Sequence, residues 1–411
     1  MVAIVFMYTG KVEATGVEAL LRTRRLASFL QIEGCVEACD LALMALANNS
    51  ASLEVVQQLY ACRQLLPAAD DDPAAPAFVS SVQGFCRQKL VQHRGQGGGT
   101  LDSVPLADLL VWAFPSAPAV LNDAAALRSL QSLSPEALEA LLANASFATD
   151  SEDSVLVMLA HWINANSGAP GAARRALVLQ LRLLHLSDAF RNALLPELSW
   201  LGLTANEHRF LCTYASAAPR ARSRLALTFY NVWGTSWYSA DARPRVVFFE
   251  GRCLDWSISQ EQLTHSTVLC AKFTECAAGH GAIVINGLEW RVQLTYMNDN
   301  SRVFFLGLCA SLPQPFARLK HLEWLCSAAG MEPCRLLLRR DAVSNGRNCQ
   351  NGPLTSDASV GMVPSIMAPL DPDDGQAAAP ARQAALISVL PISRWTGYLR
   401  DGKISGTLTV L

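Results

Sequence analysis

Residues 288–296 read LEWRVQLTY, in which apolar and polar side chains alternate at every step. The apolar positions are Leu288, Trp290, Val292, Leu294 and Tyr296. Successive side chains of a β-strand point to opposite faces of the sheet, so a period of two separates the two sets. The stretch therefore predicts an antiparallel strand with one buried face and one solvated face.

Other segments of the second half of the chain also predict strands. The apolar run at residues 303–309 follows a polar turn at residues 298–301, so we expect it to be the central strand paired with residues 288–296. Further strand candidates are residues 225–233, 246–250, 335–339 and 404–411. Short strands separated by turns are typical of a β-sandwich. Residues 351–384 are rich in Pro, Ala, Asp and Gly and predict a disordered loop.

The first half of the chain has apolar residues at helical spacing instead. Residues 17–30 and 32–47 predict a helical hairpin. Asp150 and Asp153 are spaced like a capping box ahead of a helix whose apolar face ends at Trp162. Helix follows helix without a strand signal, which is typical of an all-α bundle. The predicted fold class is α+β and multidomain, with an all-α N-terminal half and a C-terminal antiparallel β-sandwich.

Composition and charge exclude several classes of protein. The 411 residues are 51% hydrophobic and 17% charged, with a formal net charge of −2, which offers no electrostatic footprint for nucleic acid. No apolar run reaches the roughly 20 residues of a membrane span, and residues 1–7 lack the basic start of a signal peptide. The 12 cysteines form no CxxC pair, so we expect reduced thiols rather than a zinc framework. We expect a cytoplasmic and/or nuclear protein.

The sequence contains no catalytic signature. Neither GxSxG, HExxH, a P-loop nor a strand-linked GxGxxG occurs, and the histidines are dispersed. We therefore predict no catalytic, cofactor-binding or metal-binding residues, and no enzyme. Aromatic side chains crowd the second half of the chain, and two interpretations of Trp237 and Tyr238 stay open: a core pair, or part of a partner-binding peptide groove.

Residues 6–11 read FMYTGK and are followed by the predicted helix 17–30, the sequence LQIE at 30–33 and a second helix. This pattern resembles the C-terminal end of a BTB/POZ domain, in which an F-x-Y-T-G motif precedes the last two helices. The resemblance implies that Tyr8, which matches the tyrosine of the motif, lies on a partner-binding, cullin-facing surface. A structural turn residue is the alternative for Tyr8.

The rest of the chain carries weaker resemblances. Residues 148–162 (ATDSEDSVLVMLAHW) are similar to a helix start of the BACK domain, and residues 182–187 (RLLHLS) to its R-F-P-L-L-S motif, with Leu184 in place of proline. Residues 287–296 and the closing segment 395–410 resemble the MATH/TRAF-like domain of plant light-response BTB proteins. The implied domains are 1–46 (C-terminal part of BTB/POZ), 47–205 (BACK-like), 206–224 (linker) and 225–411 (MATH/TRAF-like sandwich).

The resemblance implies a protein-protein interaction adaptor, the substrate-recruiting subunit of a cullin-RING ubiquitin ligase. Its partners would be a cullin and a substrate protein, with no cofactor. Because residues 1–46 match only the end of a BTB domain, we expect this chain on its own neither to dimerise through a BTB fold nor to bind a cullin, and its oligomeric state stays open. The alternative is a non-catalytic scaffold or transcriptional co-regulator unrelated to ubiquitination.

Overall fold

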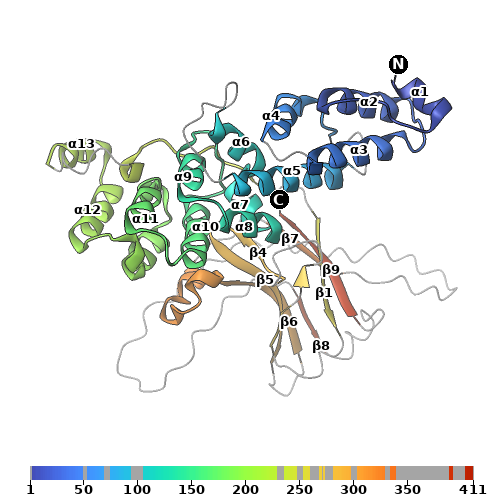
Figure 1. The fold of residues 1–411 in the computed structure, drawn as a ribbon. Helices are drawn as coiled ribbons and strands as arrows, with labels where there is room; N and C mark the ends of the chain where they lie inside the picture. The colour runs from blue at the N-terminus through green and yellow to red at the C-terminus, as the bar shows by residue number, and fades with distance from the viewer. Residues whose placement is uncertain are drawn as a thin grey trace, which may run out of the picture. The chain divides into compact units, whose positions relative to one another are not determined.

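The computed structural model is mostly helical, with a smaller antiparallel β part (Figure 1). It describes residues 2–49, 53–68, 75–93, 105–228, 236–247, 253–259, 268–270, 272–273, 281–297, 303–328, 334–338, 388–391 and 403–410. The chain divides into two compact units. The first unit comprises residues 1–120, 125–148 and 165–180, and the second comprises 121–124, 149–164 and 181–411. The predicted boundaries at 46, 205 and 224 remain predictions.

The first unit begins with helices α1 (Val2–Thr9), α2 (Val17–Phe29), α3 (Cys35–Asn49), α4 (Glu54–Ala61) and α5 (Ala75–Gln92). The predicted helical hairpin is confirmed, since α2 and α3 pack against each other. Arg24 of α2 is buried and forms an ion pair with Asp40 of α3, with 2.6 Å between Nε and Oδ1. The same guanidinium lies 4.5 Å from the centroid of the Phe78 ring, so it ties α5 to the hairpin.

The first unit continues with further short helices. Their bounds are α6 (Leu106–Ala113), α7 (Ala117–Leu121), α8 (Ala124–Gln131), α9 (Pro135–Ala143) and α11 (Gly171–Val178). The side chain of Ser134 caps α9 by accepting the N–H of Ala137 at 3.2 Å. The amide of Asn144 donates to Asp108 at 3.1 Å, which joins the end of α9 to α6.

The second unit contains helices α10 (Glu152–Ala165), α12 (Ala205–Ser216) and α13 (Pro219–Thr228). Every residue of α10 from Glu152 to Ala160 is buried, so this helix is a core element rather than one with a single apolar face. The predicted strand at 225–233 is wrong as far as it is described, because α13 continues to Thr228. Residues 229–235 lie outside the described part of the chain.

The described strands range from 2 to 10 residues, and the ladders between them are antiparallel. One sheet has the order β3-β1-β9-β7, and the other has the order β2-β5-β6-β8 with β4 paired to β5. The bounds are β1 (Cys253–Ser259), β2 (Val268–Cys270), β3 (Lys272–Phe273), β4 (Ile283–Ile285), β5 (Leu288–Met297), β6 (Val303–Ser311), β7 (Cys334–Leu338), β8 (Ser388–Pro391) and β9 (Lys403–Val410). A small α15 (Leu325–Ala328) follows β6.

Four of the predicted strands are found, as β5, β6, β7 and β9, and β6 is central because it pairs with both β5 and β8. The predicted strand at 246–250 is wrong for residues 246–247, which are not in a strand; the remainder lies outside the described residues. So do the predicted turn at 298–301 and the predicted loop at 351–384.

The polar face of β5 is covered at its first residues. Glu289 is 9% exposed, because the segment after β6 lies over it. Its Oε1 accepts the N–H of Gln314 at 3.0 Å and its Oε2 lies 3.2 Å from Nη2 of Arg291. The expectation of a solvated face is therefore wrong at Glu289, where a carboxylate satisfies a backbone donor of the covering turn.

The turn between β4 and β5 consists of Asn286 and Gly287, both with positive φ (50° and 74°). This is the pairing that two-residue hairpin turns favour, since Asn and Gly tolerate left-handed backbone. A Cβ on Gly287 would lie 2.6 Å from Cβ of Asp153 and 2.9 Å from its carbonyl carbon. Gly287 is required here for two reasons, its backbone conformation and its close contact with α10.

We predict that Gly287→Ala destabilises the protein by roughly 2–5 kcal/mol, because it adds left-handed strain to a clash with backbone. Thermal unfolding followed by circular dichroism measures this. Gly84→Ala is the matched control: Gly84 lies on an exposed turn of α5 with open space around a new Cβ, so we expect it to stabilise by about 0.5–1 kcal/mol. Equal unfolding temperatures for the two variants would contradict the packing of the hairpin against α10.

Candidate functional site

Three carboxylates gather at the start of α10: Asp150, Glu152 and Asp153. Glu152 accepts the backbone N–H of Arg182 through Oε1 at 2.9 Å. Its Oε2 lies 3.1 Å from Nε of Arg243, and the two side chains are 1% and 0% exposed. The pair is completely removed from water, so removal of either partner would leave an uncompensated buried charge.

The two aspartates accept hydrogen bonds from distant backbone. Asp153 accepts the N–H of Ser187 at 3.0 Å. Asp150 accepts the N–H of Asn286 in the hairpin turn at 2.7 Å. The predicted capping box of Asp150 and Asp153 is therefore wrong. The N–H of Ser154 is instead accepted by Oγ of Ser151 at 3.4 Å, so the capping hydroxyl belongs to Ser151.

Burial shifts the titration of this cluster. Burial raises the pKa of Asp153 to about 7. The hydrogen bonds from Ser187 lower this pKa, and the negative charges of Asp150 and Glu152 raise it. Burial also raises the pKa of Asp150 and lowers that of Arg243. Perturbed carboxyl pKa values commonly mark acid-base catalysts. Here the carboxylates bind backbone N–H groups and Glu152 and Asp153 are each 3% exposed, so the geometry favours a structural role.

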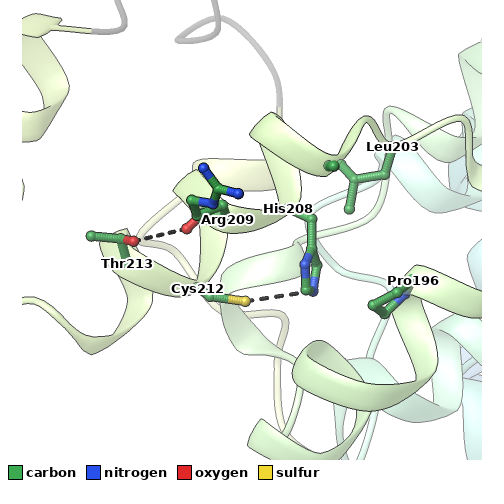
Figure 2. A pocket seen from close by; sticks show the side chains of 7 residues that line it. Pro196, Leu203, His208, Arg209, Cys212 and Thr213 are labelled. Atoms are coloured by element: carbon green, nitrogen blue, oxygen red, sulfur yellow. Dashed lines mark hydrogen bonds between the residues drawn. The ribbon is translucent and has the colours of Figure 1, made fainter.

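A pocket of about 560 Å³ lies beside α12 (Figure 2). Its polar lining comes from His208, Arg209, Cys212 and Thr213, and its apolar lining from Pro196, Leu203 and Ala205. Sγ of Cys212 lies 3.5 Å from Nε2 of His208 and donates to Oδ1 of Asn192 at 3.1 Å. The sequence pattern did not predict this site. One turn of α12 brings His208 next to Cys212, and Cys212 contacts Asn192 from a preceding segment.

This Cys-His pair is not arranged for nucleophilic catalysis. Nε2 of His208 lies 2.9 Å from the carbonyl oxygen of Arg191, and a carbonyl only accepts, so this nitrogen carries the proton. It therefore has no lone pair with which to take the thiol proton of Cys212. Burial raises the pKa of Cys212, and a raised pKa keeps the thiol protonated and unreactive.

The predicted partner-binding residues fall into two different environments. Trp237 and Tyr238 are 1% and 5% exposed, and the Tyr238 ring packs edge-on against Phe210 and Tyr214 at centroid distances of 5.5 and 6.0 Å. Burial raises the pKa of Tyr238 to about 12. These contacts favour the core interpretation, and partner binding by this pair stays a prediction. Tyr8 lies on α1, in the other unit, and is 86% exposed.

Tyr8 belongs to a group of exposed apolar side chains on α1, on α2 with its C-cap, and on α3, which we call the N-terminal apolar set. Its members are Ile4, Met7, Tyr8, Leu26, Phe29, Leu30 and Leu41. Trp324 is the other large apolar side chain that is exposed among the described residues. Helix α1 contacts α2, and α2 contacts α3, so the members of the set lie on consecutive helices that pack against one another.

Helix α1 (VAIVFMYT) has no charged residue, yet Ala3 is its sole buried residue. Phe6 is half-buried against a small core of Ala27, Cys35 and Cys39. A helix that is apolar all round is normally buried. Helix α1 therefore has the character of an element that another molecule covers.

Comparisons with protein families and with curated sequences add no indication of function. No protein-family model matches the chain, and no curated protein is significantly similar to it in sequence. Within the described residues, no group of three or more His, Cys, Asp or Glu side chains is placed to hold a metal ion. No helix in the described part of the chain is both long and apolar enough to cross a bilayer.

We predict that raising the pH from about 4 to about 7 lowers the free energy of unfolding of the wild-type protein. The same change in pH should lower that of Asp153→Asn by less. The folded pKa of Asp153, about 7, lies above the ordinary 3.8, so the folded state binds the proton that the unfolded state has lost in this window. Above pH 7 the cost is fully present, and asparagine avoids it while keeping an acceptor for Ser187.

Unfolding temperatures at pH 5, 6, 7 and 8 test this prediction. We expect the difference between Asp153→Asn and wild type to grow by at least about 2 °C between pH 5 and 8. Two pH units of titration below the folded pKa correspond to roughly 2.7 kcal/mol, and about 1 kcal/mol shifts the unfolding temperature of a chain of this size by about 1 °C. The exposed Glu136→Gln serves as the control and should leave the pH dependence unchanged. A difference that shrinks with rising pH would contradict the assignment.

Proposed function

We propose that this protein is a non-enzymatic protein-protein interaction adaptor that binds a partner protein through the N-terminal apolar set. The observation that supports the proposal is α1, a helix without charge that has a single buried residue. Tyr8 and Phe29 are 86% and 83% exposed. Exposed aromatic side chains are the usual anchors of protein interfaces, because they bury a large area on binding.

A protein partner fits this surface better than a membrane does. Helices that lie in a membrane interface carry lysine and arginine on a polar face. Helix α1 has no basic residue, and α2 pairs Arg22 with Glu18 at 2.6 Å on its exposed side. Two exposed cations in this region, Lys11 and Arg25, are matched in number by two exposed acids. Acidic residues Glu33 and Glu37 are exposed on the neighbouring turn and helix, and they would be repelled by anionic lipid.

Within this class we favour the substrate-recruiting subunit of a cullin-RING ubiquitin ligase, acting in the cytoplasm and/or nucleus. This rests on the BTB–BACK–MATH resemblance of the sequence. We further infer that the two antiparallel sheets pack face to face as the MATH/TRAF-like sandwich that holds the target. The alternative is a scaffold or transcriptional co-regulator, in which the same apolar set binds a partner without ubiquitin transfer.

We predict that Phe29→Glu and Tyr8→Glu each weaken partner binding by at least about tenfold, because a buried carboxylate without a counter-charge costs more than the roughly 1.4 kcal/mol of one decade. Affinity purification of tagged full-length protein, with quantitative mass spectrometry, measures the recovered partners. Trp324→Glu is the matched control, since Trp324 is exposed and apolar but lies outside the set. Circular dichroism checks that all three variants fold.

The identity of the recovered partner separates the two candidate functions. A cullin whose recovery depends on Phe29 and Tyr8 would support the ligase adaptor, and it would overturn the expectation that this chain alone does not bind one. Co-regulator proteins without a cullin favour the scaffold. A titration of the purified chain with a cullin N-terminal domain tests directly the expectation that this chain alone does not bind one. An identical partner set for wild type, Phe29→Glu and Trp324→Glu would contradict binding through the apolar set.

A further inference from the structure

Helix α13 (PRARSRLALT) carries three arginines and no acidic residue. Arg220 and Arg224 are exposed, and so is Ser223 between them. Arg222 points to the preceding helix, where its Nε and Nη2 donate to the carbonyls of Tyr214 and Ala215 at 3.0 and 2.6 Å. An exposed hydroxyl among guanidinium groups complements the acidic clefts in which basophilic serine kinases bind their substrates.

An arginine three residues before a serine or threonine occurs at two places in the whole sequence. One is Arg25 before Ser28, and the other is Arg220 before Ser223. Basophilic kinases read an arginine at this position, so sequence alone gives two equal candidates. The structure separates them, because the two serines lie on helices that are held in place very differently.

Ser28 lies on α2, which is fixed by six buried residues and by the ion pair of Arg24 with Asp40. Exposing Ser28 in an extended conformation would break that packing. In α13, none of the residues from Arg220 to Leu225 is buried. A helix of ten residues is marginal on its own, so we expect local unwinding around Ser223 to cost less than unwinding of α2 around Ser28.

We propose that Ser223 is a phosphorylation site for a basophilic serine kinase, recognised through Arg220. In the reaction, Oγ of Ser223 attacks the γ-phosphorus of ATP. A new P–O bond forms, the bond to the bridging β-γ oxygen breaks, and ADP leaves. The hydroxyl proton passes to the base of the kinase. This inference is independent of the proposed adaptor function, since Ser223 lies in the second unit and outside the N-terminal apolar set.

Phosphorylation neutralises most of the local positive charge. The three arginines give α13 a formal charge of +3, and a phosphate of about −2 reduces it to about +1. The new oxygens lie beside Arg222 in sequence and compete with the carbonyls of Tyr214 and Ala215 for its guanidinium. The modification therefore acts on the contact that joins α13 to α12.

The test is phosphorylation of the full-length protein by the catalytic subunit of cAMP-dependent protein kinase with Mg-ATP, mapped by mass spectrometry. We expect most of the phosphate on Ser223, a loss of that signal in Ser223→Ala, and no change in Ser28→Ala. Arg220→Ala should lower the initial rate at Ser223 about tenfold, equivalent to roughly 1.4 kcal/mol of recognition. Arg224→Ala removes the same charge from the other side of Ser223 and should have a smaller effect.

Three results would overturn the proposal. The first is incorporation mainly at Ser28 or at another residue, and the second is no incorporation at all. The third is a rate at Ser223 that is unchanged in Arg220→Ala, which would mean that the arginine is not read. Because Arg220, Ser223 and Arg224 are exposed, circular dichroism of the variants should match wild type, so a lost signal reports recognition rather than unfolding.

Discussion

The second unit depends on the side chains at the start of α10, which accept backbone N–H groups from segments far away in sequence. Glu152 accepts from Arg182, Asp153 from Ser187 and Asp150 from Asn286. Ser154 accepts from Gly287 at 2.9 Å. Each buried donor left without a partner would cost about 1–3 kcal/mol, so these bonds fix where the connecting segments and the β4–β5 hairpin lie. Asn122 adds to them, because its amide both donates to and accepts from the backbone of Val284 at 2.8 and 2.7 Å.

Local sequence pattern predicted the elements of the fold better than their connections. The alternation at 288–296 and the apolar run at 303–309 correctly predicted β5 and β6. The acidic cluster correctly predicted that a helix starts near Asp150, but not that its carboxylates serve residues up to 136 positions away. Such partners are not visible in a window of one helical turn. Two local signals did not enter the prediction. One is the alternating sequence CLDWSIS of β1, in which Leu254, Trp256 and Ile258 are buried. The other is the Asn-Gly pair of the hairpin turn.

The exposure of the candidate site residues could not be predicted from local sequence either. Tyr8, Trp237 and Tyr238 are similar in sequence terms, since each is an aromatic residue with a serine or threonine on one side and a large apolar or aromatic residue on the other. Their environments are opposite, because Tyr8 is 86% exposed and Trp237 is 1% exposed. Burial of an aromatic side chain is decided by tertiary packing, in this case by Phe210 and Tyr214 for Tyr238, and no local pattern reports it.

The two units use their side chains in contrasting ways, and this contrast bears on function. At the start of α10 the polar groups are buried and bonded to backbone, and beside α12 the proton on His208 leaves Cys212 without a base. Chemistry at these sites would require breaking bonds on which the fold depends. At α1 the opposite holds, since apolar side chains have surface to bury and gain about 25 cal/mol per Å² by burying it. Burial of these side chains on association would therefore release free energy, which agrees with the proposed binding role.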